Sequence, residues 1–534
     1  MYLFYYTLFL VIFHTFFLLR RLFPFLSKKS VLYFEEIANK GSKIFFLRLK
    51  FIQRGNTFFM DIKELSEKLK KDFAYSYDFI TVEGKIGEKD ALYFYLDGMI
   101  DKQLLEYSVI RALKEWKGDS FTAEEIGKAT FSSATVSEVE DYDKCKAQAV
   151  LGFVCFYLEE KYFSIALQSF QKRTIAEPPT SSVLKGPREG FTEDLVTNTA
   201  LLRKRLKTPD LVITKKVVGR YTQTGVCICY ISSVADKKVV DQITERIDKI
   251  DIDGIIDSSY IAQLLEDKGS PLFSRVSSQE KPDIVVAKML EGRVAIVVEG
   301  SPMVLTVPYI LWESLQDSQD YYKHSIRVTV TRVLRLFGLT LAVILPAFFV
   351  AVQEHQYQML PLKFTITIIN ATTGTPLTPT LEMLFVLLIF DMLNEASVRM
   401  PKYVGMALSI VGAIVLGETA VNAGLLSSPA VLVTAMSAIG LYTAPDSMGP
   451  FSIIRLALLG ISAIFGVYGL ILGIVVFLGY LVSIKGFGAD FTAPFSPLIF
   501  ADLKDGFVKR GIRKQVERPY SIPNKNRKRI DDGK

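Results

Sequence analysis

Long apolar runs gather in the C-terminal half of the chain, whereas most of the preceding residues mix charged and apolar positions. Five such runs cover residues 334–352, 381–396, 403–423, 429–441 and 451–484. A bilayer core takes about 20 apolar residues in a helix. Backbone groups in lipid must bond within their own segment, so these runs are predicted to be helices. The pattern predicts that the chain is organised around an integral membrane domain.

Basic residues flank this block on both sides. Lys323, Arg327, Arg332 and Arg335 precede it, and the tail from Asp502 carries eleven Lys/Arg against five Asp/Glu. The positive-inside rule places both flanks in the cytoplasm, which requires an even number of crossings. Either the glycine-rich fifth run therefore folds as two short helices, or another segment is re-entrant. The tail itself is interpreted as a solvated, partly disordered end.

The chain also begins with an apolar stretch. Residues 2–19 are apolar and are followed by Arg20, Arg21, Lys28 and Lys29. The stretch lacks the positive n-region and the A-x-A-like site of a signal peptide. We predict a possible N-terminal membrane anchor at residues 1–29. The alternatives are a helix lying in the membrane interface and an extension read from an upstream start codon.

Two soluble regions are predicted between this stretch and the membrane block. Residues 30–176 mix helical and strand-like segments, and a Pro- and Ser-containing linker follows at 177–190. Residues 191–325 alternate strands (211–218, 225–232) with helices (237–250, 284–291) and end in a hairpin (293–298 with 303–307). The predicted fold class is α/β for two soluble cytoplasmic subdomains, plus an all-α polytopic membrane domain at 326–486 with about four to six spans. A basic cytoplasmic tail fills 487–534.

Composition narrows the function classes. The 534 residues are half hydrophobic and carry a net charge of +7, which is modest for this length and does not indicate nucleic-acid binding. Four cysteines are too few for a disulfide framework and agree with a reducing compartment. The three histidines have no catalytic partner nearby in sequence, and no nucleophile, base or metal cluster is found. Neither an enzyme nor a cofactor is predicted.

Polar residues inside predicted membrane helices are functional candidates because they are costly there. Asp391, Asn394 and Glu395 share one helix face, which continues backward through Leu388 and Leu384. Carboxylates at one end of a leucine-lined face are typical of a cation pore that closes by dewetting. The alternative is ordinary leucine packing, with acids that mark the membrane edge.

Three other segments carry hypotheses. Glu418 and Asn422 lie four residues apart within the third run, which suggests either a buried hydrogen-bonded pair or an ion-facing group. Glu382 is interpreted as a surface residue at a helix start, where the dipole favours negative charge. A rigid interdomain turn, without the spacing of a phosphate loop, is predicted at Gly186, Pro187, Arg188, Glu189 and Gly190.

The order of short motifs resembles the A subunit of spore germinant receptors, the GerA family. The matching pieces are GPREGFTEDLVTN (186–198), LLRKRLKTPDLV (201–212), EGRVAIVVEGSPMVLTVP (291–308), DYYKHSIRVTVTRVLR (320–335) and LGETAVNAGLLSSP (416–429). The resemblance implies a membrane protein of the spore inner membrane, with soluble parts in the cytoplasm. It also implies a transporter-like B subunit and a lipoprotein C subunit as partners, and a homo-oligomeric cation channel that starts germination.

Other function classes stay open beside the channel. An accessory paralogue of the same family would act as a membrane scaffold or partner subunit. A secondary transporter would need inverted repeats, which the membrane block does not display in its sequence. The sequence does not reveal the germinant, the ion or the number of protomers.

Overall fold

The computed structural model describes residues 61–86, 89–115, 122–130, 135–169, 186–266, 272–399, 415–506, 508–509, 511 and 515–529. The chain divides into two compact units, Met1–Leu65 and Ser66–Lys534. Only residues 61–65 of the first unit are described, so the predicted anchor at 1–29 lies outside the described residues. The same holds for residues 177–185 of the predicted linker. Within Ser66–Lys534, two regions each form a β-sheet with its helices. They are called the first sheet unit, the described residues between 66 and 169, and the second sheet unit, those between 186 and 322.

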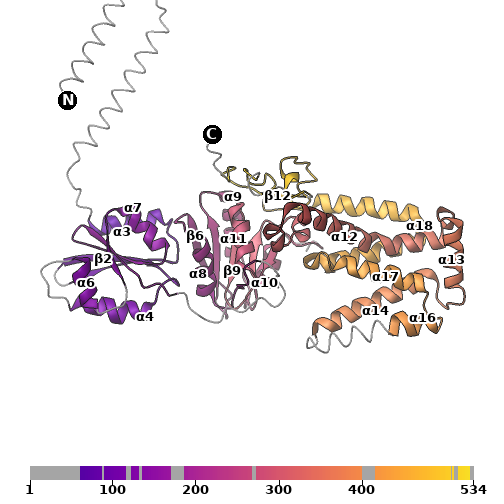
Figure 1. The fold of residues 1–534 in the computed structure, drawn as a ribbon, viewed down its shortest axis with the longest axis horizontal. Coiled ribbons are helices and arrows are strands. Elements are labelled where there is room, and N and C mark those ends of the chain that lie inside the picture. Colours follow the sequence, from indigo (N-terminus) through magenta and orange to yellow (C-terminus); the bar gives the residue numbers. More distant parts are fainter. Residues whose placement is uncertain are drawn as a thin grey trace, which may run out of the picture. The chain divides into compact units, whose positions relative to one another are not determined.

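The first sheet has five strands in the order β1-β2-β4-β5-β3, and every pairing is antiparallel (Figure 1). Its strands are β1 Phe79–Ile86, β2 Lys89–Leu96, β3 Val136–Val139, β4 Val154–Leu158 and β5 Lys161–Ile165. The accompanying helices are α3 Ile62–Asp72, α4 Lys102–Leu104, η1 Leu105–Ile110, α5 Arg111–Lys114, α6 Ala123–Thr130 and α7 Tyr142–Val150. This region was predicted only as a mixed soluble segment.

The second sheet has the order β6-β7-β9-β10-β8, and again every pairing is antiparallel. Its strands are β6 Leu211–Val218, β7 Thr224–Ile231, β8 Ser277–Gln279, β9 Val294–Val298 and β10 Val304–Val307. Its helices are α8 Leu195–Arg205, α9 Lys237–Asp248, α10 Ser258–Leu265 and α11 Pro282–Leu290. Numbered in chain order, the two sheets have the same strand order, so the second repeats the topology of the first.

The second sheet is buried on both faces. Val226 and Ile228 of β7 join a cluster with residues of α9 and α10, whereas Cys227 and Cys229 face the cluster of α8 and α11. Alternate strand residues point to opposite faces, so a sheet covered on both sides reads as a continuous apolar run. The strands and helices predicted between 211 and 307 are confirmed, each to within two residues at its ends.

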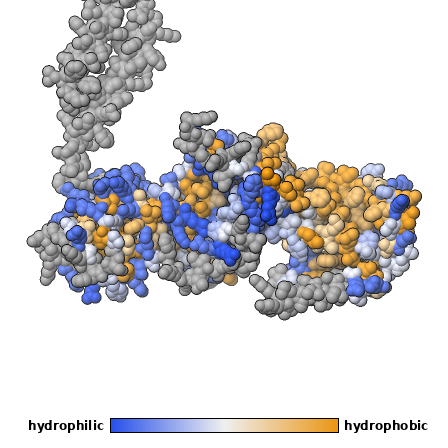
Figure 2. Space-filling view, viewed as in Figure 1, coloured by the Kyte–Doolittle hydropathy of each residue, from blue (hydrophilic) through white to orange (hydrophobic). Residues whose placement is uncertain are grey.

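The helical region contains α12 Ser325–Glu354, α13 Leu362–Thr372, α14 Pro379–Arg399, α16 Ala420–Asn422, α17 Ser428–Leu441 and α18 Met448–Ser483. Two described segments, Ser325–Glu354 and Pro445–Ser483, are long and apolar enough to cross a membrane. Apolar residues cover much of the surface of this region in Figure 2. The predicted class, α/β sheet units followed by apolar helices, is therefore confirmed. The short helix α13 was not predicted.

Hydrogen bonds at the helix ends show how α14 and α17 run relative to α12. Glu354 at the end of α12 accepts from the backbone N and the hydroxyl of Thr380, at 2.9 and 2.7 Å, so α14 starts where α12 ends. Ser427, the N-cap of α17, donates its backbone N–H to Glu382 near the start of α14. At the other end of α17, the Thr443 hydroxyl donates to the Arg335 carbonyl near the start of α12, at 3.1 Å. Both α14 and α17 therefore run antiparallel to α12.

The glycine-rich run is broken at Gly466. Its φ of 61° and ψ of −148° lie outside the helical region, and φ values of this kind favour glycine. A Cβ on Gly473 would lie 2.7 Å from Leu458, and the rings of Phe451 and Phe477 are 6.3 Å apart. A straight helix would separate residues 451 and 477 by about 39 Å. Residues 448–465 and 467–483 therefore form a helical hairpin, the two-helix alternative of the sequence analysis.

The C-terminal segment corrects the prediction of a solvated, partly disordered tail. Ile522 is fully buried with Ile310 and Ala489, and Lys525 donates its backbone N–H to the Val234 carbonyl at 2.8 Å. Arg518 donates from Nε to the Leu290 carbonyl at 2.7 Å. The described residues from 515 to 529 thus pack on the second sheet unit. Charge counting predicted solvation because it could not identify these backbone partners.

Candidate functional site

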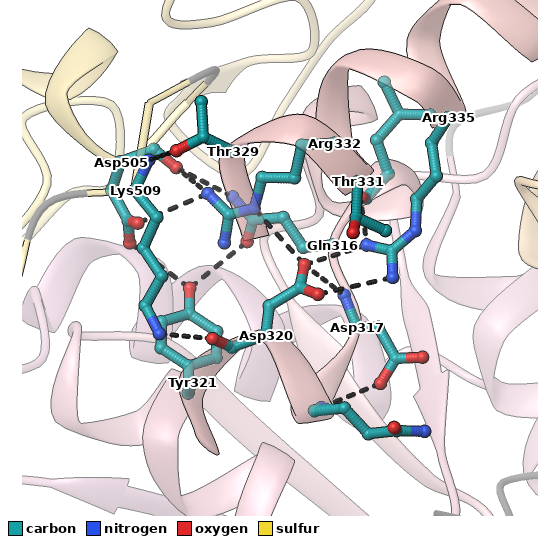
Figure 3. A network of polar contacts seen from close by, with 12 residues as sticks. Gln316, Asp317, Asp320, Tyr321, Thr329, Thr331, Arg332, Arg335, Asp505 and Lys509 are labelled. Atoms are coloured by element: carbon teal, nitrogen blue, oxygen red, sulfur yellow. Dashed lines mark hydrogen bonds and ion pairs between the residues drawn. The ribbon is translucent and has the colours of Figure 1, made fainter. Parts of the chain in front are cut away.

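The best-connected polar site lies where the second sheet unit passes into α12 (Figure 3). The short helix η3, Ser318–Tyr322, ends three residues before α12 begins. Asp317 caps η3 by accepting from the Gln319 N–H at 2.8 Å, and its own N–H donates to Asp320 at 3.3 Å. This reciprocal cap fixes Asp320 at the third position of the short helix, with its side chain buried.

Asp320 binds two arginines of α12. Arg332 donates from Nε at 3.2 Å, and Arg335 donates from Nη1 and Nη2 at 2.8 and 3.3 Å. The two arginines are three residues apart and therefore share one face of the helix. Arg335 also donates to the Leu315 carbonyl at 3.0 Å. The first turns of α12 are thereby attached to the end of the second sheet unit.

The C-terminal segment completes this junction. Arg332 donates from Nη1 to the carbonyls of Asp505 and Gly506 and to the Asp505 carboxylate, the last at 3.3 Å. Lys509 donates its ammonium to the Asp320 carbonyl and its backbone N–H to Thr329, the latter at 3.2 Å. Burial raises the pKa of the Asp505 carboxyl, and the neighbouring Arg332 opposes that shift. A segment 173 residues farther along the chain therefore meets η3 and the start of α12 around one buried arginine.

A second buried ionic group lies next to the sheet. Arg293 donates to Glu313 at 2.6 Å and to Glu291 at 2.8 Å, and the Lys288 ammonium lies 2.8 Å from the other Glu313 oxygen. Burial works to raise the pKa of Glu313, but the cations Arg293 and Lys288 outweigh it and hold that pKa below its usual value. Buried charges of this kind persist only when paired. The pairing makes the end of the second sheet unit a stiff base for the junction.

The predicted pore face of α14 is divided in the structure. The Asp391 carboxylate accepts two hydrogen bonds from Arg455 of α18, at 2.9 and 3.0 Å, and one from Ser452 at 2.9 Å. Asn394 contacts Met448 and Tyr442, and Glu395 pairs with Arg399 at the surface. Leu388 is exposed, whereas Leu384 is partly buried against the helices around it.

The other predicted residues fall at different places. Glu418 and Asn422 are both exposed, at the end of the helical region where α17 begins. Glu382 is not at the surface as predicted: it is 1% exposed and accepts the Ser427 N–H. The sequence analysis recognised the helix start but could not identify a second helix start packed against it.

The segment predicted as an interdomain turn, Gly186, Pro187, Arg188, Glu189 and Gly190, lies along the second sheet unit. Glu189 pairs with Lys204 and Arg205 of α8, at 2.9 and 2.7 Å. A Cβ on Gly186 would lie 2.8 Å from the Tyr322 ring, next to the junction. Its φ of +124° also favours glycine. Which subdomains this turn joins stays a prediction.

Sequence reasoning missed Arg455 and Asp320, and it used Arg332 and Arg335 only as orientation signals. Arg455 interrupts the apolar run FSIIRLALLG, and the rule that intramembrane charges pair would have linked it to Asp391. No comparable signal identified Asp320, whose partners come from α12 and from Lys509, 189 positions later. In the part of the chain that the structure describes, no group of three or more His, Cys, Asp or Glu side chains could hold a metal ion.

Comparison with known proteins identifies the family. Residues 67–521 match the family model described as Bacillus/Clostridium GerA spore germination protein. Spore germination protein KA of Bacillus subtilis is 33% identical over 469 residues, covering 86% of each chain. Spore germination protein A1 of the same organism is 29% identical over 446 residues, covering 82% of this chain and 91% of that protein.

A solved structure is also similar in sequence. It is the N-terminal domain of the A subunit of the Bacillus megaterium spore germinant receptor GerK3. The identity is 28%, the match covers 46% of this chain and 93% of that one, and the TM-score is 0.36. Given the family match over residues 67–521, this chain belongs to the GerA family of spore germination proteins.

Proposed function

We propose that this chain is the A subunit of a spore germinant receptor and forms an oligomeric cation channel in the spore inner membrane. Its partners would be a transporter-like B subunit and a lipoprotein C subunit, with the sheet units in the cytoplasm. The family match supports the role in germination. The observation that carries the proposal is the junction around Asp320 and Arg332, which ties the second sheet unit directly to the first membrane helix.

A transducing subunit needs such a connection because a change sensed in one part must reach the helices. Asp320, Arg332 and Arg335 are joined by three side-chain hydrogen bonds, and the Asp320 and Arg332 side chains are 1–2% exposed. Water and salt do not screen such a buried group as they would a surface pair. A displacement of the sheet unit would therefore move the start of α12 with it.

In this proposal α14 faces the pore. Leu388 and Glu395 are exposed in the single chain, and the Asp391 side chain is about one-third exposed. Rings of these residues in an oligomer would concentrate cations and close the path with leucines. One observation favours the alternative of a membrane scaffold: Arg455 already compensates the charge of Asp391. The two candidates differ in whether α14 meets water.

Potassium flux from liposomes holding the purified full-length protein separates the two candidates. We expect Leu388→Ala to leak potassium constitutively and Asp391→Ala to lower the flux. Leu432→Ala, an exposed leucine on α17, is the matched control and leaves the flux unchanged. If no flux appears and neither variant differs, the assignment of α14 is wrong. Flux that requires the B and C subunits still supports a channel, whereas silence in their presence favours the scaffold.

A further inference from the structure

A line of hydrogen bonds crosses four helices of the membrane region, and it starts at Pro346 in the middle of α12. Proline has no backbone N–H, so the carbonyl four residues earlier, that of Ala342, loses its usual helical partner. The Ser437 hydroxyl of α17 donates to this carbonyl at 2.6 Å. Such side-chain donors are how membrane helices tolerate an internal proline. A residue of α17 thus replaces the helical hydrogen bond that α12 lacks at Pro346.

Arg455 of α18 continues the line. Its Nη1 donates to the same Ser437 hydroxyl at 3.0 Å, and its Nη2 donates to Asp391 of α14. The guanidinium is fully buried, whereas the Asp391 side chain is about one-third exposed. Nη2 also donates to Ser452 at 3.2 Å, and Ser452 in turn donates to Asp391. The fork of one arginine therefore connects Ser437, which satisfies the Ala342 carbonyl of α12, to the charged residue of α14.

This arrangement uses a property that is specific to arginine. A guanidinium presents donors in a rigid planar fork, so fixing one nitrogen on Ser437 fixes the direction of the other. A lysine at this position would keep the charge but offer a single flexible ammonium. A charge buried among apolar helices is costly and needs its partners close by. If Ser437 moved and Asp391 did not, Arg455 could no longer keep its hydrogen bonds to both residues.

We propose that Arg455 is a positioning residue that transmits movement of α12 at Pro346 to Asp391 on α14. The junction attaches α12 to the second sheet unit, so this relay extends from that unit to the helix assigned to the pore. The inference rests on the proposed function only for what the movement of α14 does. Whether the movement is transmitted is a separate question with its own measurement.

The distance between α12 and α14 tests the relay without any reference to ion flow. Spin labels on Leu334→Cys and Met392→Cys report it, since both positions are exposed and the four native cysteines are buried. Arg455→Lys keeps the charge and removes the fork, and Ser437→Ala removes the link to α12 without touching a charge. We expect each variant to shift or broaden the distance distribution. The double variant should be no worse than the single ones, because both break the same link.

Ser462→Ala is the matched control, a buried serine on α18 outside this line of hydrogen bonds. It should leave the distance unchanged. If Ser437→Ala also leaves it unchanged while Arg455→Lys alters it, Arg455 serves only its ion pair and the relay is wrong. Additive effects of the two variants would overturn it as well.

Potassium leak from liposomes gives the second readout, and a purely structural role would not produce a leak. Under the proposed function, both variants raise basal leak about tenfold, a typical size for coupling between sites. Altered distances, together with wild-type protein that passes no potassium even when the B and C subunits are present, would refute the channel and support the relay. If the wild-type protein passes potassium but Arg455→Lys and Ser437→Ala change neither the distance nor the leak, the relay is refuted and the channel is not.

Discussion

The two sheet units share one strand order but differ in the charges that they bury. In the described part of the first sheet unit, Asp78 is the buried acidic or basic side chain. The described part of the second sheet unit buries several acidic and basic side chains, among them Arg203, Lys288 and Arg293. Apart from Arg203, which meets Asp78, these charges lie toward the helical region and the C-terminal segment. The same strand order therefore occurs in two units that bury different numbers of charged side chains.

Asp78, the buried acid of the first sheet unit, pairs with the second sheet unit. Asp78 accepts from Nε and Nη2 of Arg203 at 2.9 and 2.8 Å, and Ser76 accepts from the same guanidinium at 3.2 Å. Next to them the Tyr77 N–H donates to the Ile213 carbonyl of β6 at 2.8 Å. The comparison teaches that buried ion pairs lie at the connections between parts of this molecule, whereas the cores of the sheets are apolar. At the connection with the helices an apolar cluster that includes Phe273 and Trp312 acts beside the ion pairs.

Asp320→Ala, at the connection between the second sheet unit and α12, should lower the free energy of unfolding the most. It leaves Arg332 and Arg335 without their shared carboxylate, and breaking a buried pair from one side costs about 3–5 kcal/mol. Thermal unfolding of the purified full-length protein in detergent measures the loss.

Asp251→Ala is the control for that change, because the Asp251–Arg220 pair lies at the surface of the same unit. Solvent screens an exposed pair of this kind, so its loss should change the unfolding temperature little. Equal losses in the two variants would mean that burial does not set the strength of these connections.

Asp78→Ala should break the connection between the two sheet units at a cost of about 3 kcal/mol. The expected signature is separation, because each sheet keeps its own core. A protease should cut between the units sooner, and calorimetry should resolve two transitions in place of one. Asp90→Ala, an exposed acid at the start of β2, is the control within the same sheet. A single transition at a lower temperature would contradict the view that the units are separate bodies joined by this pair.

The sequence predicted local structure well where one stretch of chain determines the outcome. The apolar run of β7 and the apolar spacing of α9 predicted their elements because those patterns reflect the core directly. The break in the fifth apolar run was one of the two alternatives that the parity of the basic flanks left open, and the structure has it at Gly466.

The sequence did not predict the connections, because each one depends on partners from distant segments. Asp320 accepts from Lys509, 189 positions later, and Asp391 meets an arginine 64 positions later. The repeated topology was also not visible, because matching strands of the two units share no motif. A pattern along the chain reports burial but not the identity of what covers it.

Arg518→Ala should have a smaller effect, on the described residues 515–529, which pack on the second sheet unit. Its side chain donates to the carbonyls of Leu290, Asn526 and Lys528, and unsatisfied buried carbonyls cost about 1–3 kcal/mol. Hydrogen exchange of residues 515–529 should rise while exchange in the first sheet stays the same. Lys525→Ala, whose ammonium is exposed, is the control. Unchanged exchange after Arg518→Ala would show that the apolar contacts of Ile522 suffice.

The smallest effect concerns Glu189, at the predicted interdomain turn, and it depends on pH. A hydrogen bond from Lys204, together with the charges of Lys204 and Arg205, holds the pKa of Glu189 below its usual value. An acid whose pKa is lowered by folding stabilises the fold above its unfolded pKa of about 4.3, and that contribution disappears as pH falls through the lowered value. Because the group is partly exposed, Glu189→Gln should cost at most about 1 kcal/mol at pH 7. Unfolding of both proteins in urea between pH 3 and pH 7 measures the difference, which should shrink below about pH 4. A difference that stays constant with pH would mean that Glu189 acts through packing. A difference that grows toward acid would mean that folding raises the pKa of Glu189, which contradicts the ion pair with Lys204 and Arg205.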